Sequence, residues 1–217
     1  MSATLSEEDS KRLLAPFGIP LVAGEVAHSA VAASGAAARL GFPVVAKLCG
    51  ERIAHKTERG LVRLNLTDED AVAVAAAELF AAARPEDGDV GVLLAPMVRG
   101  NRELIAGVST DPQFGATVMV GVGGVLAEAL GDVSVRLVPI EEIDAFEMLD
   151  DLRSQALLGP LRGEPAVDRA AVVAVLMALS KAAQAHPEIV SIDLNPLIIV
   201  GGLPVAVDAL VELEDRA

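Results

Sequence analysis

Apolar residues recur with two different spacings that alternate along this chain, and this alternation constrains the fold more than any other feature. Segments 29–40 and 168–185 are Ala-rich or almost wholly apolar and have the length of helices. Segments 44–48 and 90–94 are short apolar runs with the length of buried strands. Helices and strands that follow one another in this way predict a mixed α/β (α+β) chain.

The ends of these segments carry the residues that start and stop regular structure. Helix caps are expected at Ser6, at Ser29 and in the run Thr67-Asp68-Glu69-Asp70, and Gly201-Gly202 predicts a hairpin. We place a boundary after residue 95, which gives an N-terminal lobe 1–95 and a C-terminal lobe 96–217. The predicted helices are 6–16, 29–40, 67–84, 140–149 and 168–185, and the predicted strands are 21–23, 44–48, 61–66, 90–94, 103–109, 116–122, 133–138, 190–200 and 203–210.

Strand 61–66 shows the clearest alternation. Val62, Leu64 and Leu66 fall on one predicted face, and Arg63 and Asn65 fall on the other. We therefore expect a half-exposed strand with its three apolar side chains on one face.

Composition excludes several classes of function. The chain of 217 residues has 17 Lys and Arg against 31 Asp and Glu, and it has neither Trp nor Tyr. A nucleic-acid partner is not expected, because phosphate contacts need a basic surface and single-stranded bases need aromatic side chains for stacking. The single cysteine, Cys49, excludes an internal disulfide, and it is expected to be a small buried side chain. The acidic start of the chain and the short apolar runs predict a cytoplasmic protein with no membrane contact.

One short stretch reverses the acidic balance. Between positions 47 and 63 the only acids are Glu51 and Glu58, and His55 lies among the basic residues. A local excess of positive charge favours an anionic ligand, and histidine can accept and release a phosphoryl group or a proton near neutral pH. The alternative is an exposed loop histidine without a role. The basic residues of this stretch, called the basic island below, are Lys47, Arg52, Lys56, Arg59 and Arg63.

Lys47 ends the apolar run 44–46, and a buried lysine needs an anionic partner. Two interpretations remain open: a ligand for phosphate, or a lysine that emerges where its strand ends. The glycine-rich run 121–124 leaves a similar choice. Gly123 and Gly124 would let backbone N–H groups approach phosphate oxygens, or they form a tight turn.

Asp193 and Asn195 lie two residues apart and therefore share a strand face, and Asp208 follows in the second strand of the same predicted hairpin. If these oxygen-bearing side chains are buried, they need a cation or hydrogen-bond donors. A carboxylate, an amide and phosphate oxygens suit Mg²⁺ better than zinc. The alternative is a pair of turn-capping side chains.

These residues lie in a longer pattern that resembles the ATP-grasp β subunit or domain of the NDP-forming acyl-CoA synthetases, with succinyl-CoA synthetase β subunits as more distant relatives. The resemblance covers about residues 5–213 and is most specific over 102–128. The segments that carry it are 35–47, 55–57, 102–108, 111–115, 121–124 and 195–197.

The resemblance implies an ATP-grasp fold with the nucleotide between two lobes. It implies that Lys47, Glu103, Gly123 and Gly124 contact ATP or ADP, that His55 is transiently phosphorylated, and that Asn195 and Asp208 bind Mg²⁺. The segment Leu94, Ala95 and Met97 would form the hinge beside the adenine. For Glu103 and Glu128, contact with ribose, contact with metal and a structural role all remain open. The short acid Asp193 stands where relatives often carry Glu, which leaves its role undecided.

The implied reaction is acyl-CoA + ADP + phosphate ⇌ acid + CoA + ATP, and the chain is expected to be one part of the enzyme. The CoA-binding part would be an α subunit, in an α2β2-type assembly, or a fused domain. Two alternatives are a free-standing carboxylate–amine ligase, which would not need His55, and a nucleotide-sensing regulatory module without turnover.

Overall fold

The computed structural model describes residues 2–50, 52–53, 56, 59–124 and 130–214. The chain divides into two compact units. The small unit comprises Thr4–Ser10 and Val22–Met97, and the large unit comprises Met1–Ala3, Lys11–Leu21 and Val98–Ala217. Helix α1 (Glu7–Leu14) therefore contributes its first turn to the small unit and its remainder to the large one. The chain passes from the small to the large unit after Met97, two residues beyond the lobe boundary placed from the sequence.

The small unit consists of an antiparallel sheet with two helices on one face. The strand order is β2-β5-β3-β4. A core of small and branched side chains fills the space under the helices, with Leu48, Leu79 and Leu94 fully buried. Its elements are β2 (Glu25–Ala27), α2 (Ala30–Leu40), β3 (Val44–Gly50), β4 (Val62–Leu66), α3 (Glu69–Ala82), η2 (Pro85–Asp87) and β5 (Val90–Pro96).

The prediction that Val62, Leu64 and Leu66 share one face is wrong, because Val62 pairs with Lys47 on one face and Leu66 pairs with the core residue Val44 on the other. Leu64 is 59% exposed. The register between β3 and β4 shifts between Val44 and Ala46, and Asn65 has a left-handed backbone with φ 63°. The extra residue of this β-bulge interrupts the alternation of side chains, so that Leu64 does not point into the core. Asparagine tolerates the left-handed conformation better than a branched residue does.

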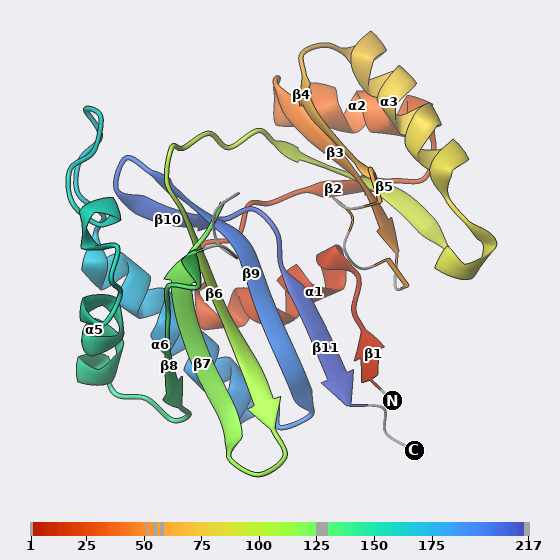
Figure 1. Ribbon diagram of the computed structural model, residues 1–217. Coiled ribbons are helices and arrows are strands. Elements are labelled where there is room, and N and C mark those ends of the chain that lie inside the picture. Colours follow the sequence, from red (N-terminus) through yellow and green to blue (C-terminus); the bar gives the residue numbers. More distant parts are fainter. Residues whose placement is uncertain (1, 51, 54–55, 57–58, 125–129, 215–217) are drawn as a thin grey trace. The chain divides into compact units, whose positions relative to one another are not determined.

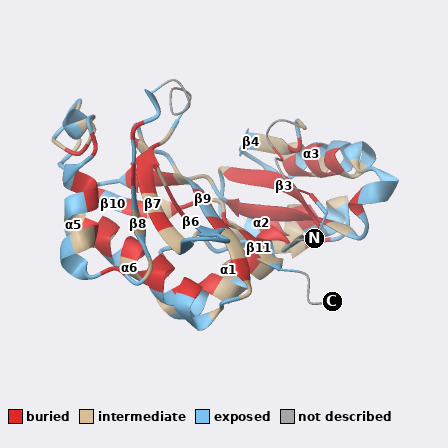
Figure 2. Ribbon diagram, turned by 60° about the horizontal axis from the view of Figure 1, so that its bottom comes forward, coloured by how far each residue is buried: buried red, intermediate tan, exposed pale blue. Residues whose placement is uncertain are grey.

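The large unit is a sheet covered on one face by helices. In the described residues its seven strands have the order β1-β11-β9-β6-β7-β8, with β10 paired to β9. Helices α5 and α6 lie along the same side of this sheet (Figure 1). Many residues of α6 and of the strands are buried (Figure 2). The elements are β1 (Ser2–Thr4), η1 (Ala15–Phe17), β6 (Glu103–Asp111), β7 (Gly115–Val122), β8 (Val133–Leu137), α5 (Glu142–Asp150), η3 (Gln155–Leu157), α6 (Arg169–Ala185), β9 (Ile189–Val200), β10 (Leu203–Ala206) and β11 (Leu210–Glu214).

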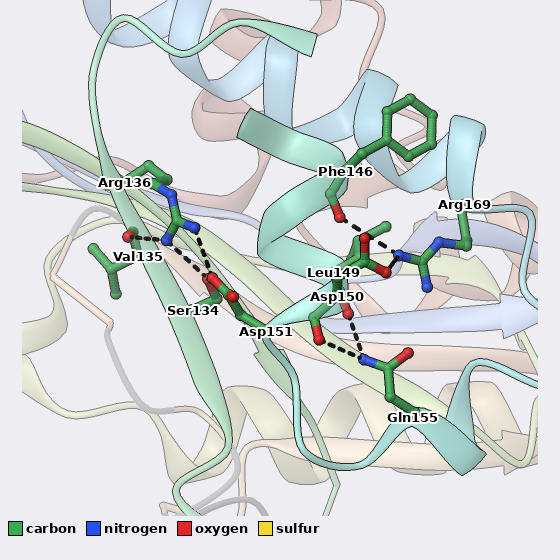
Figure 3. A network of polar contacts seen from close by, with 9 residues as sticks. All are labelled: Ser134, Val135, Arg136, Phe146, Leu149, Asp150, Asp151, Gln155 and Arg169. Atoms are coloured by element: carbon green, nitrogen blue, oxygen red, sulfur yellow. Dashed lines mark hydrogen bonds and ion pairs between the residues drawn. The ribbon is translucent and has the colours of Figure 1, made fainter. Parts of the chain in front are cut away.

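Edge strand β8 directs its polar side chains toward the helices. Ser134 is buried and bonds Asp151 at 3.2 Å, and the Arg136 guanidinium donates to the same carboxylate at 2.6 Å. Figure 3 shows this contact beside a second one, in which Arg169 of α6 meets Asp150 at the end of α5. Arg136 also lowers the pKa of Asp151. These contacts fix the segment that follows α5 to the sheet edge.

Two predicted strands differ from those observed. The strand predicted at 21–23 lies at Glu25–Ala27 instead, and Leu21 forms only an isolated bridge with Ala206. The hairpin at Gly201-Gly202 is confirmed, but the strand predicted at 203–210 breaks after Ala206 and resumes as β11. Within the described ranges, no helix has both the length and the apolar character that a membrane crossing requires.

Candidate functional site

Lys47 lies inside β3 rather than at its end, with 8% of its side chain exposed. Its cross-strand neighbours are Leu93 of β5 and Val62 of β4. Because side chains alternate along a strand, Lys47 lies on the face opposite to the core residues Ala46 and Leu48. The backbone of Lys47 is thus held between two strands, and its side chain lies on the face that α2 and α3 leave uncovered.

The ammonium of Lys47 lies 2.9 Å from Oε1 of Glu7, in the first turn of α1. The other carboxylate oxygen of Glu7 accepts a hydrogen bond from Lys56 at 2.5 Å. The side chain of Glu7 is fully buried, and that of Lys56 is 7% exposed. The three residues are called the lysine–glutamate triad below, and Glu7 is a candidate site residue that the sequence analysis missed. Its acidic residue type in a first helical turn is ordinary, so no local signal distinguished it from Glu8.

The basic island has more acidic neighbours than its sequence suggested. Arg59 donates two hydrogen bonds to Asp87, both at 2.8 Å, and Arg63 contacts Glu78 at 3.1 Å. Arg59 lowers the pKa of Asp87 to about 2. Together with Glu7, distant acids thus meet four of the five basic side chains. The inference that this stretch carries a surplus of positive charge is wrong, because the carboxylates that neutralise it come from residues 7, 78 and 87.

His55 lies outside the described residues, and so does Glu128. Lys56, which follows His55 in the sequence, is described, and its carbonyl accepts a hydrogen bond from Leu61 N at 2.8 Å. The chain is therefore fixed at Lys56 through both its backbone and its side chain.

The predicted hinge residues occupy the end of β5. Leu94 is fully buried in the core under the helices, whereas Ala95 pairs with Val45 on the face that carries Lys47. The backbone N–H of Met97 donates to Pro43 O at 3.0 Å. The side chain of Leu94 thus packs in the core, and only Ala95 of this set shares a sheet face with Lys47.

In the large unit, Glu103 and the glycine-rich run come together. Gly123 N donates to Glu103 O at 2.8 Å. A Cβ on Gly123 would lie 3.0 Å from the β6 backbone, and one on Gly124 would lie 3.6 Å from Glu103 Oε2. Gly124 has φ +83°. Glycine is thus needed at 123 for close approach of two backbones and at 124 for a left-handed conformation.

Asn195 and Asp208 lie on neighbouring segments of the large sheet. Leu210 pairs with Asp193, and Val207 N donates to Pro196 O at 3.3 Å, so the same register sets Asp208 opposite Asn195. Asp193 and Asn195 are exposed on one face, as the alternation predicted. The condition of burial is not met at Asp193 and Asn195, whereas Asp208 is half-buried.

The oxygen donors of this pair fit a hard cation such as Mg²⁺. An amide oxygen and a carboxylate oxygen supply two ligands, and Mg²⁺ commonly completes its shell with substrate phosphates and water. The part of the chain that the structure describes contains no cluster of three or more His, Cys, Asp or Glu side chains arranged for a metal. The role of this pair remains a prediction.

Cys49 is 5% exposed, as predicted for a small buried side chain, and burial raises the pKa of its thiol. It lines a cavity of about 310 Å³ in the small unit. The other lining residues include His28, Arg52, Asp87 and Asp89.

A model of the ATP-grasp domain matches residues 1–213, so the chain belongs to the ATP-grasp family. Within this family, it is 35% identical over 208 residues to the β subunit of acetate–CoA ligase (ADP-forming) I from Pyrococcus furiosus. That alignment covers 94% of this chain and 90% of the subunit. The chain is thus the β, ATP-grasp portion found in ADP-forming acid–CoA ligases, and the resemblance inferred from the sequence is confirmed.

Solved structures support the same assignment. Acetyl-coenzyme A synthetase 1 of Ca. Korarchaeum cryptofilum, in complex with coenzyme A and Ca-AMPCP, matches with a TM-score of 0.90 and 33% identity over 97% of this chain and 93% of that one. Another structure of that enzyme, with coenzyme A and Mg-AMPPCP, has its phosphohistidine segment pointing towards the nucleotide binding site. It matches with a TM-score of 0.81 and 33% identity, covering 95% and 91% of the two chains. The predicted ATP-grasp fold is confirmed.

Proposed function

We propose that this chain is the nucleotide-binding, phosphoryl-transferring component of an ADP-forming acid–CoA ligase. The observation that carries the proposal is the match to a β subunit over nine tenths of both chains. The reaction would be acyl-CoA + ADP + phosphate ⇌ acid + CoA + ATP. Acyl phosphate forms with the CoA-binding partner, and the phosphoryl group reaches ADP by way of this chain. We assign the partner as an α subunit, in an α2β2-type assembly, or as a fused domain, and place the enzyme in the cytoplasm.

In the direction of ATP use, a nitrogen of the neutral His55 imidazole attacks the γ-phosphorus of ATP. The N–P bond forms, the bond from phosphorus to the β,γ-bridging oxygen breaks, and ADP leaves with that electron pair. Histidine suits this role because its lone pair is available near neutral pH and the phosphorylated ring is a good leaving group in the reverse direction.

The remaining predicted site residues would hold the nucleotide. Lys47 provides a cation for the phosphates, and the backbone at Gly123-Gly124 provides donors beside Glu103. Asn195 and Asp208 would hold Mg²⁺, which neutralises charge on the transferred group when bound. Ala95 and the backbone of Leu94 and Met97 would contact the base.

Labelling tests this function. The chain is incubated with [γ-³²P]ATP and Mg²⁺, with and without its CoA-binding partner, and the protein is examined for label that is lost in acid and kept in base. We expect such label on the wild type and on His28→Ala, which alters an exposed histidine, and none on His55→Ala. Equal labelling of wild type and His55→Ala, or no label on the wild type with its partner, would refute the proposal.

A further inference from the structure

We propose that Glu7 is a positioning residue that fixes the phosphate-binding ammonium of Lys47 and the anchor of the His55 segment with one carboxylate. The inference rests on the proposed function of Lys47 and His55. Its structural basis is the lysine–glutamate triad: two oxygens of one buried carboxylate meet ammonium groups from different elements, at 2.9 Å and 2.5 Å.

Loss of these contacts is expected to be costly because all three side chains are buried. The Glu7 side chain is fully buried, and the two lysine side chains are 8% and 7% exposed. A buried carboxylate is stable as an ion only beside cations and donors, and loss of one partner of a buried pair is far more disruptive than loss of a surface pair. Removal of the charge on Glu7 is therefore expected to move the two lysines, because both ammonium groups lose the buried carboxylate that they share.

Two residues of the triad, Glu7 and Lys47, are held by regular backbone structure. Glu7 begins α1, where Ser6 Oγ accepts a hydrogen bond from Asp9 N at 3.1 Å and donates to Asp9 Oδ2 at 2.6 Å. Lys47 lies in β3 between β4 and β5. Because both backbones are fixed, the contact with the Glu7 carboxylate helps to hold the Lys47 ammonium in place.

Lys56 connects the triad to the phosphoryl carrier. It is the neighbour of His55 in the sequence, and its carbonyl bonds Leu61 N just before β4 begins. Glu7 thus connects Lys56, the residue that follows His55, to Lys47, which would bind the phosphates. Displacement of reacting groups by about 1 Å costs on the order of a hundredfold in rate, so this link should affect transfer more than the fold.

The neighbouring acid provides a matched control. Glu7→Gln is nearly isosteric, but the amide offers one acceptor oxygen and turns an NH₂ group toward the second ammonium, so at most one lysine contact survives. Glu8→Gln makes the same chemical change one residue later, at an exposed side chain. Lys56→Gln removes the Glu7 contact of the residue that follows His55 and keeps both partners of the Lys47–Glu7 contact.

The full chain is measured with its partner in two ways: calorimetric binding of Mg-ADP, and the initial rate of His55 labelling from [γ-³²P]ATP. For Glu7→Gln we expect a Kd at least about tenfold higher and a labelling rate at least about tenfold lower. For Lys56→Gln we expect the slower labelling with a Kd within about twofold of wild type. Glu8→Gln should leave both quantities unchanged.

Several outcomes would overturn the inference. It fails alone if wild type labels on His55 but Glu7→Gln, shown to be folded by circular dichroism, binds and labels within about twofold of wild type. If Glu7→Gln does not fold, Glu7→Asp, which keeps the charge but withdraws it by one methylene, is judged by the same criterion. A wild type that neither labels nor binds Mg-ADP refutes the proposed function and this inference together.

Discussion

Arg102 offers the sharpest test of what holds the large unit together. Its side chain is 2% exposed, and its guanidinium donates to three carbonyl oxygens and forms an ion pair with Glu164 at 3.2 Å. The carbonyls belong to Leu157 at 3.3 Å, Gly159 at 2.9 Å and Pro165 at 2.7 Å. One side chain thus ties four positions of the segment between α5 and α6 to the start of β6.

The substitution Arg102→Lys keeps the charge but removes the planar guanidinium, whose N–H donors point in several directions. A lysine ammonium has three donors at one point, so it cannot reach four acceptors arranged around a guanidinium, and we count at least two contacts as lost. Hydrogen bonds to charged groups contribute about 1.5–3 kcal/mol each, which gives about 3–6 kcal/mol. We use the lower end of this range, about 3 kcal/mol, as the expected loss.

The assay is urea unfolding followed by far-ultraviolet circular dichroism, since the chain has no Trp or Tyr for intrinsic fluorescence. In thermal unfolding the same loss corresponds to a decrease in Tm of about 6–12 °C for a chain of this size. The control is Arg162→Lys, the same exchange at an exposed arginine of the same unit, with an expected change within about 0.5 kcal/mol. A loss below about 1 kcal/mol for Arg102→Lys would show that these contacts contribute little beyond those available from water.

Three further predictions concern other parts of the chain. The Arg59 contact lowers the pKa of Asp87 to about 2, so its stabilisation should be complete above about pH 4 and lost as pH falls to about 2; Asp87→Asn should remove this component of the pH dependence of urea unfolding. Leu64→Thr should change the free energy of unfolding by less than about 0.5 kcal/mol, whereas Leu48→Ala should cost about 2–5 kcal/mol; equal costs would contradict the β-bulge. Asp208→Asn should raise the Mg²⁺ concentration for half-maximal labelling by about tenfold, and an unchanged Mg²⁺ dependence would remove Asp208 from the metal site.

The helix starts could be predicted from the sequence because capping is local. Ser29 and Asp68 each accept a hydrogen bond from the backbone N–H three residues later, so a residue type and a short spacing suffice. The Gly201-Gly202 hairpin is local in the same sense. Local patterns in the sequence therefore predicted most helices and strands of both units, although β1 was missed, one strand was misplaced and β10 and β11 were merged.

The bulge in β4 could not be predicted, because it depends on a partner strand. The alternation of Val62, Leu64 and Leu66 is that of a regular strand, and only the register against β3 shows that one residue is extra. Asn65 is compatible with a left-handed backbone, but asparagine is also common in ordinary loops. Asn65 therefore permits the bulge, but the bulge itself arises from the pairing with β3, which the sequence does not show.

Acids that are distant in sequence also change the interpretation of the anion site predicted at Lys47. A count along the chain gave the basic island an excess of positive charge, but Glu7, Glu78 and Asp87 lie 15 to 49 residues away in sequence from the groups that they meet. An anion site at Lys47 therefore cannot rest on surplus charge. It rests instead on the position in which the buried Glu7 carboxylate holds the Lys47 ammonium. Phosphate affinity should accordingly respond to the geometry of Glu7 more than to the total charge of the segment, and substitution of exposed Arg52, which leaves the triad intact, should affect it less than Glu7→Gln does.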